Sequence, residues 1–329
     1  MSFAKDLIGK KGCNMSAAKP TLIYLIGIPG CGKSTYAKTL KGYTIHSSDA
    51  LRKELFNDEN FQGDNNAVFE ELHKRIINDL RNGKDVVYDA TNLNRKRRMD
   101  FLRRLSKIEC RKSCKLVIAP YHTCVKRNNN RERKVPIDAM KRMYMSFQPP
   151  HKNEGWDDID IIVSCGKYDY KDYTLHTLYN KATGIDNFNQ CNKFHTLTLG
   201  EHCRKATEYI SRYYSENLLL ASTALIHDVG KVFTQTNINS KGEKDGDCHY
   251  YGHNSVGAYD SIFYSINAQR SVDDILHIAV LIYFHMLPYN WKDEKEGMLA
   301  KTKGRFRTQV GEELFNEIIA LYDADRYAH

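Results

Sequence analysis

Two groups of residues in this chain of 329 residues have types and spacings suited to phosphate chemistry. The first is the segment "GIPGCGKST", which fits the pattern Gly-x4-Gly-Lys-Ser of a phosphate-binding loop. An apolar run precedes it and a helical pattern follows it, which is the context that such a loop requires. Backbone N–H groups there surround the phosphates, the lysine neutralises the β- and γ-oxygens, and the serine supplies an oxygen to Mg²⁺. We therefore expect ATP or GTP to bind at Gly27, Gly30, Gly32, Lys33, Ser34 and Thr35.

Two aspartates follow other strand-like runs in the same half. Asp49 ends the run "YTIHSSD", and Arg52 comes one helical turn later. Because the carboxyl ends of parallel strands border the ligand crevice of a doubly wound sheet, Asp49 is suited to accept a proton from an attacking hydroxyl and Arg52 to hold a nearby phosphate. The alternative is that Asp49 and the two serines before it only cap the next helix. Asp89, at the end of "VVYD", has the form that often holds Mg²⁺ or its water, together with Ser34.

The second group consists of imidazoles and carboxylates spread over the C-terminal part of the chain. They fall on five helical segments, within or beside apolar surroundings: His202, His227, Asp228, His253, His285 and Asp325. A single histidine in a helix is more often a hydrogen-bonded core residue. Burying so many polar groups without a shared partner would be costly, however, and a metal ion would satisfy them together. Such ligands suit Mn²⁺, Fe²⁺, Ni²⁺, Zn²⁺ or Mg²⁺, and the pattern predicts metal-assisted hydrolysis of a phosphate ester.

The elements that must position these residues fall into two classes. Strand-like runs at 21–28, 43–49, 85–90, 115–122 and 159–165 alternate with amphipathic helices, which predicts an α/β domain with a doubly wound parallel sheet of about five strands. Long helical segments follow and predict an all-α bundle. We expect an N-terminal extension at 1–19, a phosphate-binding domain at 20–165, a polar, Tyr-rich connector at 166–193 and the helical domain at 194–329.

Composition restricts the ligand and the compartment. The net charge is +9, and residues 95–134 hold fifteen Lys or Arg against three acidic residues. This basic tract predicts a polyanionic ligand such as nucleic acid, or else a solvated helix face. The longest apolar run, at 275–287, is shorter than the roughly 20 residues that span a bilayer, so we expect no membrane segment. Nine cysteines without regular spacing favour a reducing, cytoplasmic compartment.

Longer segments of the first half carry a family resemblance. "GIPGCGKST", "SSDALR", "DATNLNRKRR" and "VKRNNNRERKVPIDAMKRMYMSF" resemble, in order and spacing, the kinase domain of bacteriophage polynucleotide kinase-phosphatase. The resemblance implies that Asp49 is the general base for a 5′-hydroxyl and that Arg52 binds the neighbouring phosphate of the acceptor. It further implies that Arg131, in a lid segment, clamps the γ-phosphate of ATP with support from Arg127. The basic tract would then bind the acceptor strand.

The second half is similar to another family. "HTLTLGEHCRKA", "ALIHDVGK", "YGHNSVGA" and "LYDADRYAH" resemble the HD phosphohydrolase superfamily, in particular the HD domains attached to tRNA nucleotidyltransferases. The resemblance implies four primary metal ligands: His202, His227, Asp228 and Asp325. It implies that His253 and His285 hold a second metal with Asp228 bridging, and that Lys231 faces the substrate phosphate. Two alternatives stay open, Asp323 in place of Asp325 and His249 in place of His253.

The two resemblances together predict a bifunctional enzyme that heals broken nucleic-acid ends. Fused HD and polynucleotide-kinase enzymes of bacterial RNA repair resemble this arrangement, although their HD part comes first. We expect ATP-dependent phosphorylation of 5′-hydroxyl ends of RNA or DNA, tRNA included, and hydrolysis of 2′,3′-cyclic phosphate or 2′/3′-phosphate ends with one or two divalent metals. An RNA ligase would act afterwards, in the cytoplasm of a bacterium or a phage-infected cell. One alternative is a small-molecule or nucleoside kinase fused to a nucleotide-cleaving HD hydrolase. Another is an ATP-switched RNA-binding protein with a structural HD domain.

Overall fold

The N-terminal part of the protein is an α/β layer built on one parallel sheet. The computed structural model describes residues 19–58, 63–191, 196–291 and 296–329. Five strands pair in the order β2-β3-β1-β4-β5, and their bounds are Thr21–Ile26 (β1), Thr44–Ser47 (β2), Val86–Asp89 (β3), Arg111–Ile118 (β4) and Asp158–Val163 (β5). Apolar side chains occupy nearly every position of the central strand β1, as expected for a strand covered on both faces. The predicted five-stranded parallel sheet is confirmed.

Six helices connect and cover these strands. They are Lys33–Thr39 (α1), Ser48–Phe56 (α2), Asn65–Arg81 (α3), Arg95–Arg104 (α4), Tyr121–Asn129 (α5) and Ile137–Tyr144 (α6), and the 3₁₀ turn Lys152–Glu154 (η1) precedes β5. Polar residues fix several starting points, since Asn94 accepts a hydrogen bond from the Arg97 N–H and Asp64 accepts one from the Ala67 N–H. Because all five strands are parallel, the loops after β1, β2, β3 and β5 open on the same edge of the sheet.

The C-terminal part is helical, as the sequence predicts. Short turns come first, at Lys167–Tyr170 (η2), Leu175–Leu178 (α7) and Ile185–Asn187 (η3). The remaining helices follow: Leu199–Tyr213 (α8), Leu218–Ile226 (α9), the single turn Lys231–Thr234 (α10), His253–Asn267 (α11), Val272–Phe284 (α12), Glu296–Val310 (α13) and Glu312–Tyr327 (α14), with the turn Leu287–Trp291 (η4) between α12 and α13. Thr198 and Glu201 form a capping box that starts α8.

One expected helix is broken in two. The sequence predicts continuous helix through "ALIHDVGK", whereas α9 ends at Ile226 and α10 begins at Lys231. Gly230 lies in this turn, and a Cβ atom there would lie 2.0 Å from the backbone oxygen of His253. The close approach of α11 therefore requires glycine at this turn, and the turn carries His227 and Asp228.

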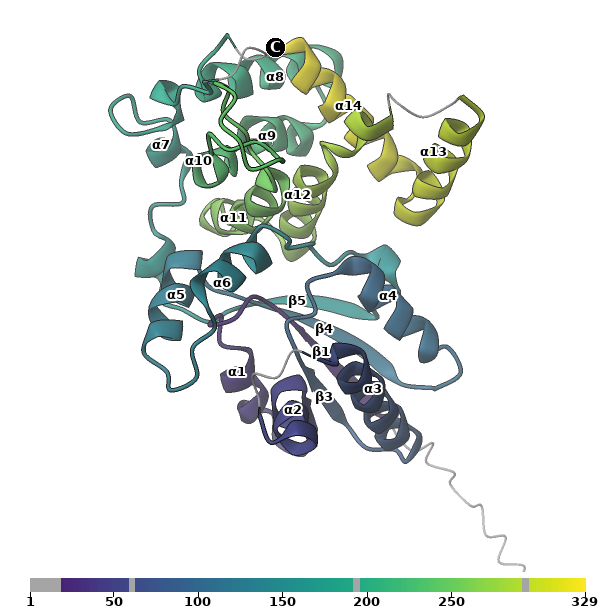
Figure 1. Ribbon diagram of the computed structural model, residues 1–329. Coiled ribbons are helices and arrows are strands. Elements are labelled where there is room, and N and C mark those ends of the chain that lie inside the picture. Colours follow the sequence, from purple (N-terminus) through teal and green to yellow (C-terminus); the bar gives the residue numbers. More distant parts are fainter. Residues whose placement is uncertain (1–18, 59–62, 192–195, 292–295) are drawn as a thin grey trace, which may run out of the picture.

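The two parts share one apolar core. A continuous cluster of buried side chains runs from β1 and β4 through Tyr144 and Phe147 to Tyr259 and Ile282, and a smaller cluster lies between α8, α9, α12 and α14. Figure 1 shows α11 and α12 facing α6 and β5 across the junction, with α13 and α14 farther from the sheet. The helical part therefore packs directly against the α/β layer.

A single stretch in the described part of the chain, Val272–Trp291, is long and apolar enough to cross a membrane by length and composition. Half of its most apolar window is buried inside the protein. Ile275, Ile278 and Ile282 of this stretch belong to the shared core. The core helix of a globular protein passes the same test, and α12 packs as such a helix.

Candidate functional site: a nucleotide pocket and a buried histidine cluster

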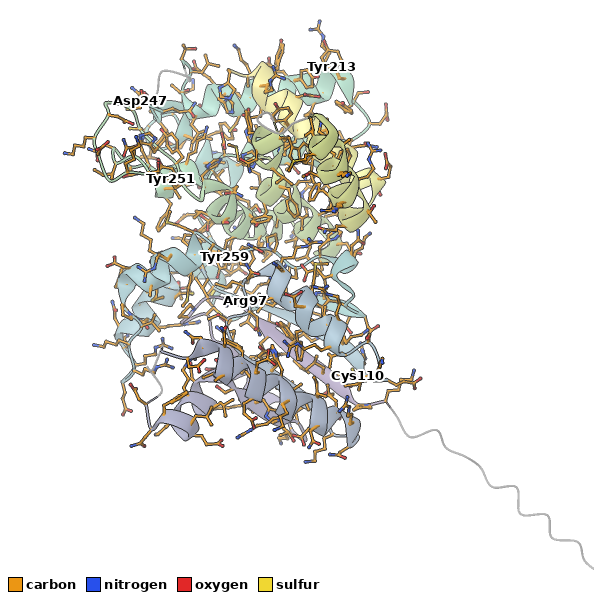
Figure 2. All side chains as sticks on the ribbon, turned by 45° about the vertical axis from the view of Figure 1, so that its right-hand side comes forward. Arg97, Cys110, Tyr213, Asp247, Tyr251 and Tyr259 are labelled. Atoms are coloured by element: carbon orange, nitrogen blue, oxygen red, sulfur yellow. The ribbon has the colours of Figure 1, made fainter. Side chains whose placement is uncertain are left out.

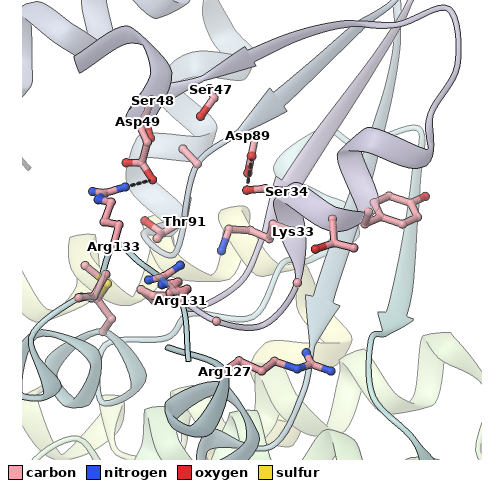
Figure 3. Close-up of a pocket in the computed structure, with 18 of the residues that line it drawn as sticks. Lys33, Ser34, Ser47, Ser48, Asp49, Asp89, Thr91, Arg127, Arg131 and Arg133 are labelled. Atoms are coloured by element: carbon pink, nitrogen blue, oxygen red, sulfur yellow. Dashed lines mark hydrogen bonds and ion pairs between the residues drawn. The ribbon is translucent and has the colours of Figure 1, made fainter. Parts of the chain in front are cut away.

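A large cavity opens at the carboxyl edge of the sheet, over the phosphate-binding loop. Its volume is about 1230 Å³. Figure 3 shows Lys33, Asp49, Arg131 and Arg133 around this space. The loops after β1, β2, β3 and β5 contribute to the lining, together with the segment that joins α5 to α6, through Gly30, Gly32, Lys33, Ser34, Thr35, Asp49, Arg52, Asp89, Arg127, Arg131, Arg133, Lys134, Arg142 and Ser164 among others.

The phosphate-binding loop has the backbone that its glycines permit. Gly30 and Gly32 have φ angles of 81° and 96°, and a Cβ atom at Gly30 would lie 2.3 Å from the backbone oxygen of Cys124. The Lys33 ammonium donates a hydrogen bond to the Ile28 carbonyl at 3.0 Å, inside the curve of the loop. Gly27, the first glycine of the motif, donates its N–H to the Thr91 carbonyl at 3.1 Å.

The two predicted Mg²⁺ residues are hydrogen-bonded to each other. The Ser34 hydroxyl donates to Asp89 Oδ2 at 2.7 Å (Figure 3). Asp89 is buried at the end of β3, whereas Ser34 lies at the start of α1. A hydroxyl and a carboxylate oxygen, both suited to a hard cation, therefore meet at the floor of the cavity.

Asp49 lies on the opposite wall, in the first turn of α2. Its carboxylate is half exposed and contacts two guanidinium groups, Arg52 at 3.0 Å and Arg133 at 2.5 Å. Arg52 itself is buried, donates to Asn65 at 2.9 Å and lies over the Phe69 ring. Arg133 was not among the predicted site residues, although its position two residues after Arg131 in "RERK" was an available signal.

The two arginines expected to bind the γ-phosphate are held differently. Arg131 donates to Asn128 Oδ1 at 2.8 Å, and Asn128 also exchanges two hydrogen bonds with the Val135 backbone. Arg127 donates to the Ser164 carbonyl at 2.7 Å and to its hydroxyl at 3.1 Å. Arg131 thus belongs to the loop between α5 and α6, while Arg127 is fixed to the loop that follows β5.

The six histidines and aspartates of the helical part converge. His202, His227, Asp228 and Asp325 each offer one ligand atom within 4.8 Å of the others, and Asp228, His253 and His285 form a second such group. All six residues are buried. They come from α8, the turn after α9, the start of α11, the residue after α12 and the last turn of α14. Asp228 belongs to both groups.

Backbone carbonyls orient the four imidazoles. His202, His227, His253 and His285 each place Nδ1 next to a carbonyl oxygen, at 3.4, 2.7, 2.8 and 2.6 Å. A carbonyl only accepts, so each Nδ1 carries a proton and each Nε2 is turned inward. Nε2 of His202 lies 3.3 Å from Nε2 of His227, and the same distance separates His253 from His285.

This donor set suits a cation. Two nitrogens that bind one ion at about 2.1 Å lie about 3.0–3.4 Å apart at the usual ligand angles. Both Nε2 pairs have that separation. Asp228 Oδ1 is buried and has no hydrogen-bond partner among the described residues, although Nε2 of His253 and of His285 lie 3.3 and 3.5 Å away. Its other oxygen, Oδ2, lies 3.4 Å from Nε2 of both His202 and His227.

Electrostatics in the cluster favour ionised carboxylates. Burial alone would raise the pKa of Asp228, but Lys231 and His227 outweigh it and hold that pKa well below its usual value. Burial lowers the pKa of His202, yet hydrogen bonds to Asp228 and Asp325 raise it to about 9. Lys231 Nζ lies 2.7 Å from Asp228 Oδ2 and donates to Gln190 at 2.9 Å. Lys231 is therefore already paired inside the cluster.

The two alternatives that the sequence left open lie outside both groups. His249 Nε2 is 3.0 Å from Asp245 in an exposed loop, and Asp323 is in neither group. Tyr289 was missed by sequence reasoning: its hydroxyl donates to Asp325 Oδ2 at 2.8 Å. Nothing in the spacing of the η4 turn signals this contact, because it joins segments 36 residues apart.

Comparisons with known proteins bear on the nucleotide pocket. Residues 22–150 match a family model described as AAA domain. An L-seryl-tRNA(Sec) kinase of Methanococcus maripaludis is 29% identical over 166 residues, which are 46% of this chain and 62% of that protein. A putative bifunctional polynucleotide kinase/RNA ligase of Autographa californica nuclear polyhedrosis virus is 30% identical over 146 residues, 38% of this chain and 20% of that protein.

The N-terminal α/β part, which contains residues 22–150, has a P-loop kinase fold. A chain in the solved Pnkp1/Rnl/Hen1 RNA repair complex is similar at 24% identity and a TM-score of 0.36, over 40% of this chain and 44% of its own. The present chain spans less than two thirds of the length of the curated relatives that it matches.

Part of the basic tract is engaged within the protein. Arg98 is wholly buried and pairs with Glu154 at 2.6 Å. Other members pair with acidic residues on neighbouring elements, as Arg104 does with Glu70. Only the end of the tract lines the nucleotide pocket, through Arg127, Arg131, Arg133 and Lys134. The sequence showed the charge but not the partners of Arg104 and Arg98, because those lie 34 and 56 residues away.

Proposed function

We propose that the protein heals nucleic-acid ends with two active sites, an ATP-dependent 5′-hydroxyl kinase and a metal-dependent phosphohydrolase of the HD type. The observation that carries the proposal is the presence of two separate constellations, a P-loop pocket with a carboxylate facing it and a buried set of four imidazoles and two carboxylates. Phosphate addition at one end and phosphate removal at the other are the two steps that make a cleaved strand fit for an RNA ligase, tRNA included.

In the kinase reaction, the acceptor oxygen attacks the γ-phosphorus of ATP, the bond to the β–γ bridging oxygen breaks, and ADP leaves. Asp49 takes the proton of the acceptor hydroxyl, and Arg52 and Arg133 hold its carboxylate in place. Lys33 and Arg131 stabilise the charge that develops on the transferred phosphoryl group. Ser34 and Asp89 are the residues that would hold Mg²⁺, which supplies charge neutralisation at the β- and γ-oxygens.

In the hydrolytic reaction, a water oxygen attacks the phosphorus of a 2′,3′-cyclic or terminal phosphate, and the bond to the ribose oxygen breaks, with a proton going to that oxygen. His202, His227, Asp228 and Asp325 would hold one divalent cation, and Asp228, His253 and His285 a second. Bound cations of this kind lower the pKa of a coordinated water and polarise a phosphoryl oxygen. Lys231 fixes the orientation of the shared carboxylate of Asp228.

One substrate tests both assignments. An oligoribonucleotide with a 5′-hydroxyl and a 2′,3′-cyclic phosphate is incubated with labelled ATP and, in separate reactions, Mg²⁺, Mn²⁺, Fe²⁺, Ni²⁺ or Zn²⁺. Lys33→Ala should abolish 5′ labelling and leave hydrolysis of the 3′ end intact, whereas Asp228→Ala should do the reverse. If the wild-type protein catalyses neither step, the proposed function is wrong. If one substitution removes both steps, the assignment of separate sites is wrong.

The relative named L-seryl-tRNA(Sec) kinase favours a second candidate for the kinase half, in which the acceptor hydroxyl belongs to a small group or an aminoacylated tRNA. The two candidates differ at Arg52, which a 5′-end kinase needs for the phosphate next to the acceptor nucleoside. Shortening the acceptor to a mononucleoside should reduce phosphorylation about 100-fold for an end-healing kinase, a loss typical of removing a charged transition-state contact. A nucleoside kinase would phosphorylate it equally well, and a kinase for an aminoacylated tRNA would phosphorylate neither the oligonucleotide nor the mononucleoside.

A further inference from the structure

Helix α11 of the helical part lies directly against α6, the helix that borders the nucleotide pocket. At the start of α11, a Cβ atom on Gly252 would lie 2.7 Å from the backbone oxygen of Met145, the residue that follows α6. Gly252 also has a φ of 76°. Only glycine permits this approach, so the backbones of the two helices are in direct contact. In Figure 2, Tyr259 lies at this junction between the two parts of the protein.

Two side chains of α11 reach into the kinase domain. The Tyr259 hydroxyl donates to the Ala119 carbonyl at 2.8 Å, just after β4. One residue later, Asp260 accepts a hydrogen bond from the Tyr144 hydroxyl at 2.5 Å. Tyr144 is the last residue of α6 and is almost fully buried. The partners are 116 residues apart, so this contact exists only because the helical part is docked.

Aromatic packing fixes the end of α6 around that hydrogen bond. The Tyr144 ring is stacked on Tyr121 of α5, with centroids 4.6 Å apart and 8° between the planes. Edge-on contacts come from Phe233 of α10 at 5.0 Å and Tyr259 at 5.3 Å. Three of the neighbours of Tyr144, counting Asp260, therefore belong to the helical part.

The opposite side of α6 faces the pocket over the phosphate-binding loop. Ala139, Arg142 and Met143 line the pocket, and the loop immediately before α6 contributes Arg133 and Lys134. Arg142 and Met143 directly precede Tyr144 in the sequence. A rotation or shift of α6 would move these groups relative to Lys33 and Asp49, which are fixed on the sheet.

We propose that Asp260, a residue of the helical part, is a positioning residue for phosphoryl transfer in the kinase domain. By holding the Tyr144 hydroxyl it fixes α6, and α6 places the arginine-bearing segment over the donor phosphates. This inference rests on the proposed function for the identity of the acceptor. The positioning of α6 by Asp260 requires only that ATP binds at the P-loop. The kinase domain is thus completed by the helical part and is not an independent catalytic unit.

The test compares Asp260→Ala, Asp260→Asn and Tyr144→Phe in the full-length protein. Asp260→Ala should lower kcat for phosphoryl transfer about tenfold, equivalent to about 1.4 kcal/mol, because misplacement of a positioned group costs rate more than ground-state binding. The KM for ATP should change by about threefold or less. Asp260→Asn keeps an oxygen acceptor and should restore kcat to within about twofold, a rescue that a general packing defect would not show.

Ser261→Ala is the matched control, since Ser261 is the next residue of α11, is buried, and among the described residues donates its hydroxyl to Ala258 of its own helix. Binding of a fluorescent ATP analogue to each variant, with Lys33→Ala as the negative control, separates this inference from the proposed function. If the wild-type protein binds the analogue but phosphorylates no RNA, the proposed function is wrong and the inference about Asp260 still stands to be tested. In that case the ordering of α6 is measured by the protection of residues 131–143 against proteolysis. The inference is overturned if Asp260→Ala leaves kcat and that protection unchanged, or lowers them no more than Ser261→Ala.

Discussion

The shared carboxylate of Asp228 gives the sharpest prediction about the helical part. Asp228 Oδ1 faces His253 and His285, whereas Oδ2 faces His202 and His227. Loss of this one side chain should therefore weaken both metal groups at once. Loss of the His285 imidazole should weaken only one of them.

The size of the effect follows from linkage. An ion at 100 times its Kd stabilises the folded state by about 2.7 kcal/mol, so two ions contribute about 5 kcal/mol. For a chain of this length, with about 2 °C for each kcal/mol, the Tm of the metal-depleted wild type should rise by about 10 °C when metal is restored. His285→Gln should retain about half of that rise, and Asp228→Ala almost none.

The assay is thermal unfolding of protein stripped with a chelator, with and without each of Mn²⁺, Fe²⁺, Ni²⁺, Zn²⁺ and Mg²⁺, and with metal stoichiometry measured in parallel. For each variant, the Tm with metal is compared with the Tm of the same variant without metal. This is necessary because Asp228→Ala also removes the carboxylate that pairs with the buried Lys231, which should lower the free energy of unfolding by about 3–5 kcal/mol without any metal. His277→Gln is the control, since His277 pairs with Glu317 outside both groups. The reasoning is refuted if no ion raises the Tm of the wild type, or if Asp228→Ala gains as much as the wild type.

Two further predictions concern single charged groups. Arg98→Met should lower the free energy of unfolding by about 3–5 kcal/mol, because the buried Glu154 would lose its closest cation, at 2.6 Å, and keep the more distant Arg95, at 3.7 Å. The substitution should leave the affinity for RNA unchanged. Urea unfolding and filter binding test the two parts, and a selective loss of RNA affinity would contradict the buried role. Burial raises the pKa of Asp260 to about 7, opposed by the hydrogen bond from Tyr144. A raised carboxyl pKa means that the folded state binds the proton more tightly than the unfolded state, so this contribution is complete below about pH 4 and is lost as the pH rises through 7. The titratable groups that lie close to Asp260 in the described structure are tyrosines: Tyr144, Tyr173, Tyr259 and Tyr264. Between pH 4 and 8 the free energy of unfolding of the wild type should therefore fall by up to about 3 kcal/mol more than that of Asp260→Asn. This figure is reduced from the full pKa shift because the Asp260 side chain is partly exposed. Equal decreases in the two proteins would contradict the prediction.

Local sequence patterns were sufficient to predict the strands and the nucleotide loop, but not the break between α9 and α10. The apolar runs near Thr21 and Val86 predict buried parallel strands, because both faces of such strands are covered. The glycines before Lys33 predict the phosphate-binding loop, because only that residue type permits its backbone. Histidines within apolar helices predict a shared ligand, because isolated buried imidazoles are costly. All of these signals act over a few residues, which is why they can be read without the fold.

The tertiary structure decided which groups meet. It brought the two oxygens of Asp228 to different pairs of imidazoles and buried Arg98 against Glu154. It also set Asp260 on Tyr144, across 116 residues of sequence. Pattern and propensity report the local environment of a side chain, whereas these partners are fixed by how whole helices dock on the sheet. Contacts of that kind depend on packing over the entire chain, and no short stretch of the sequence contains them.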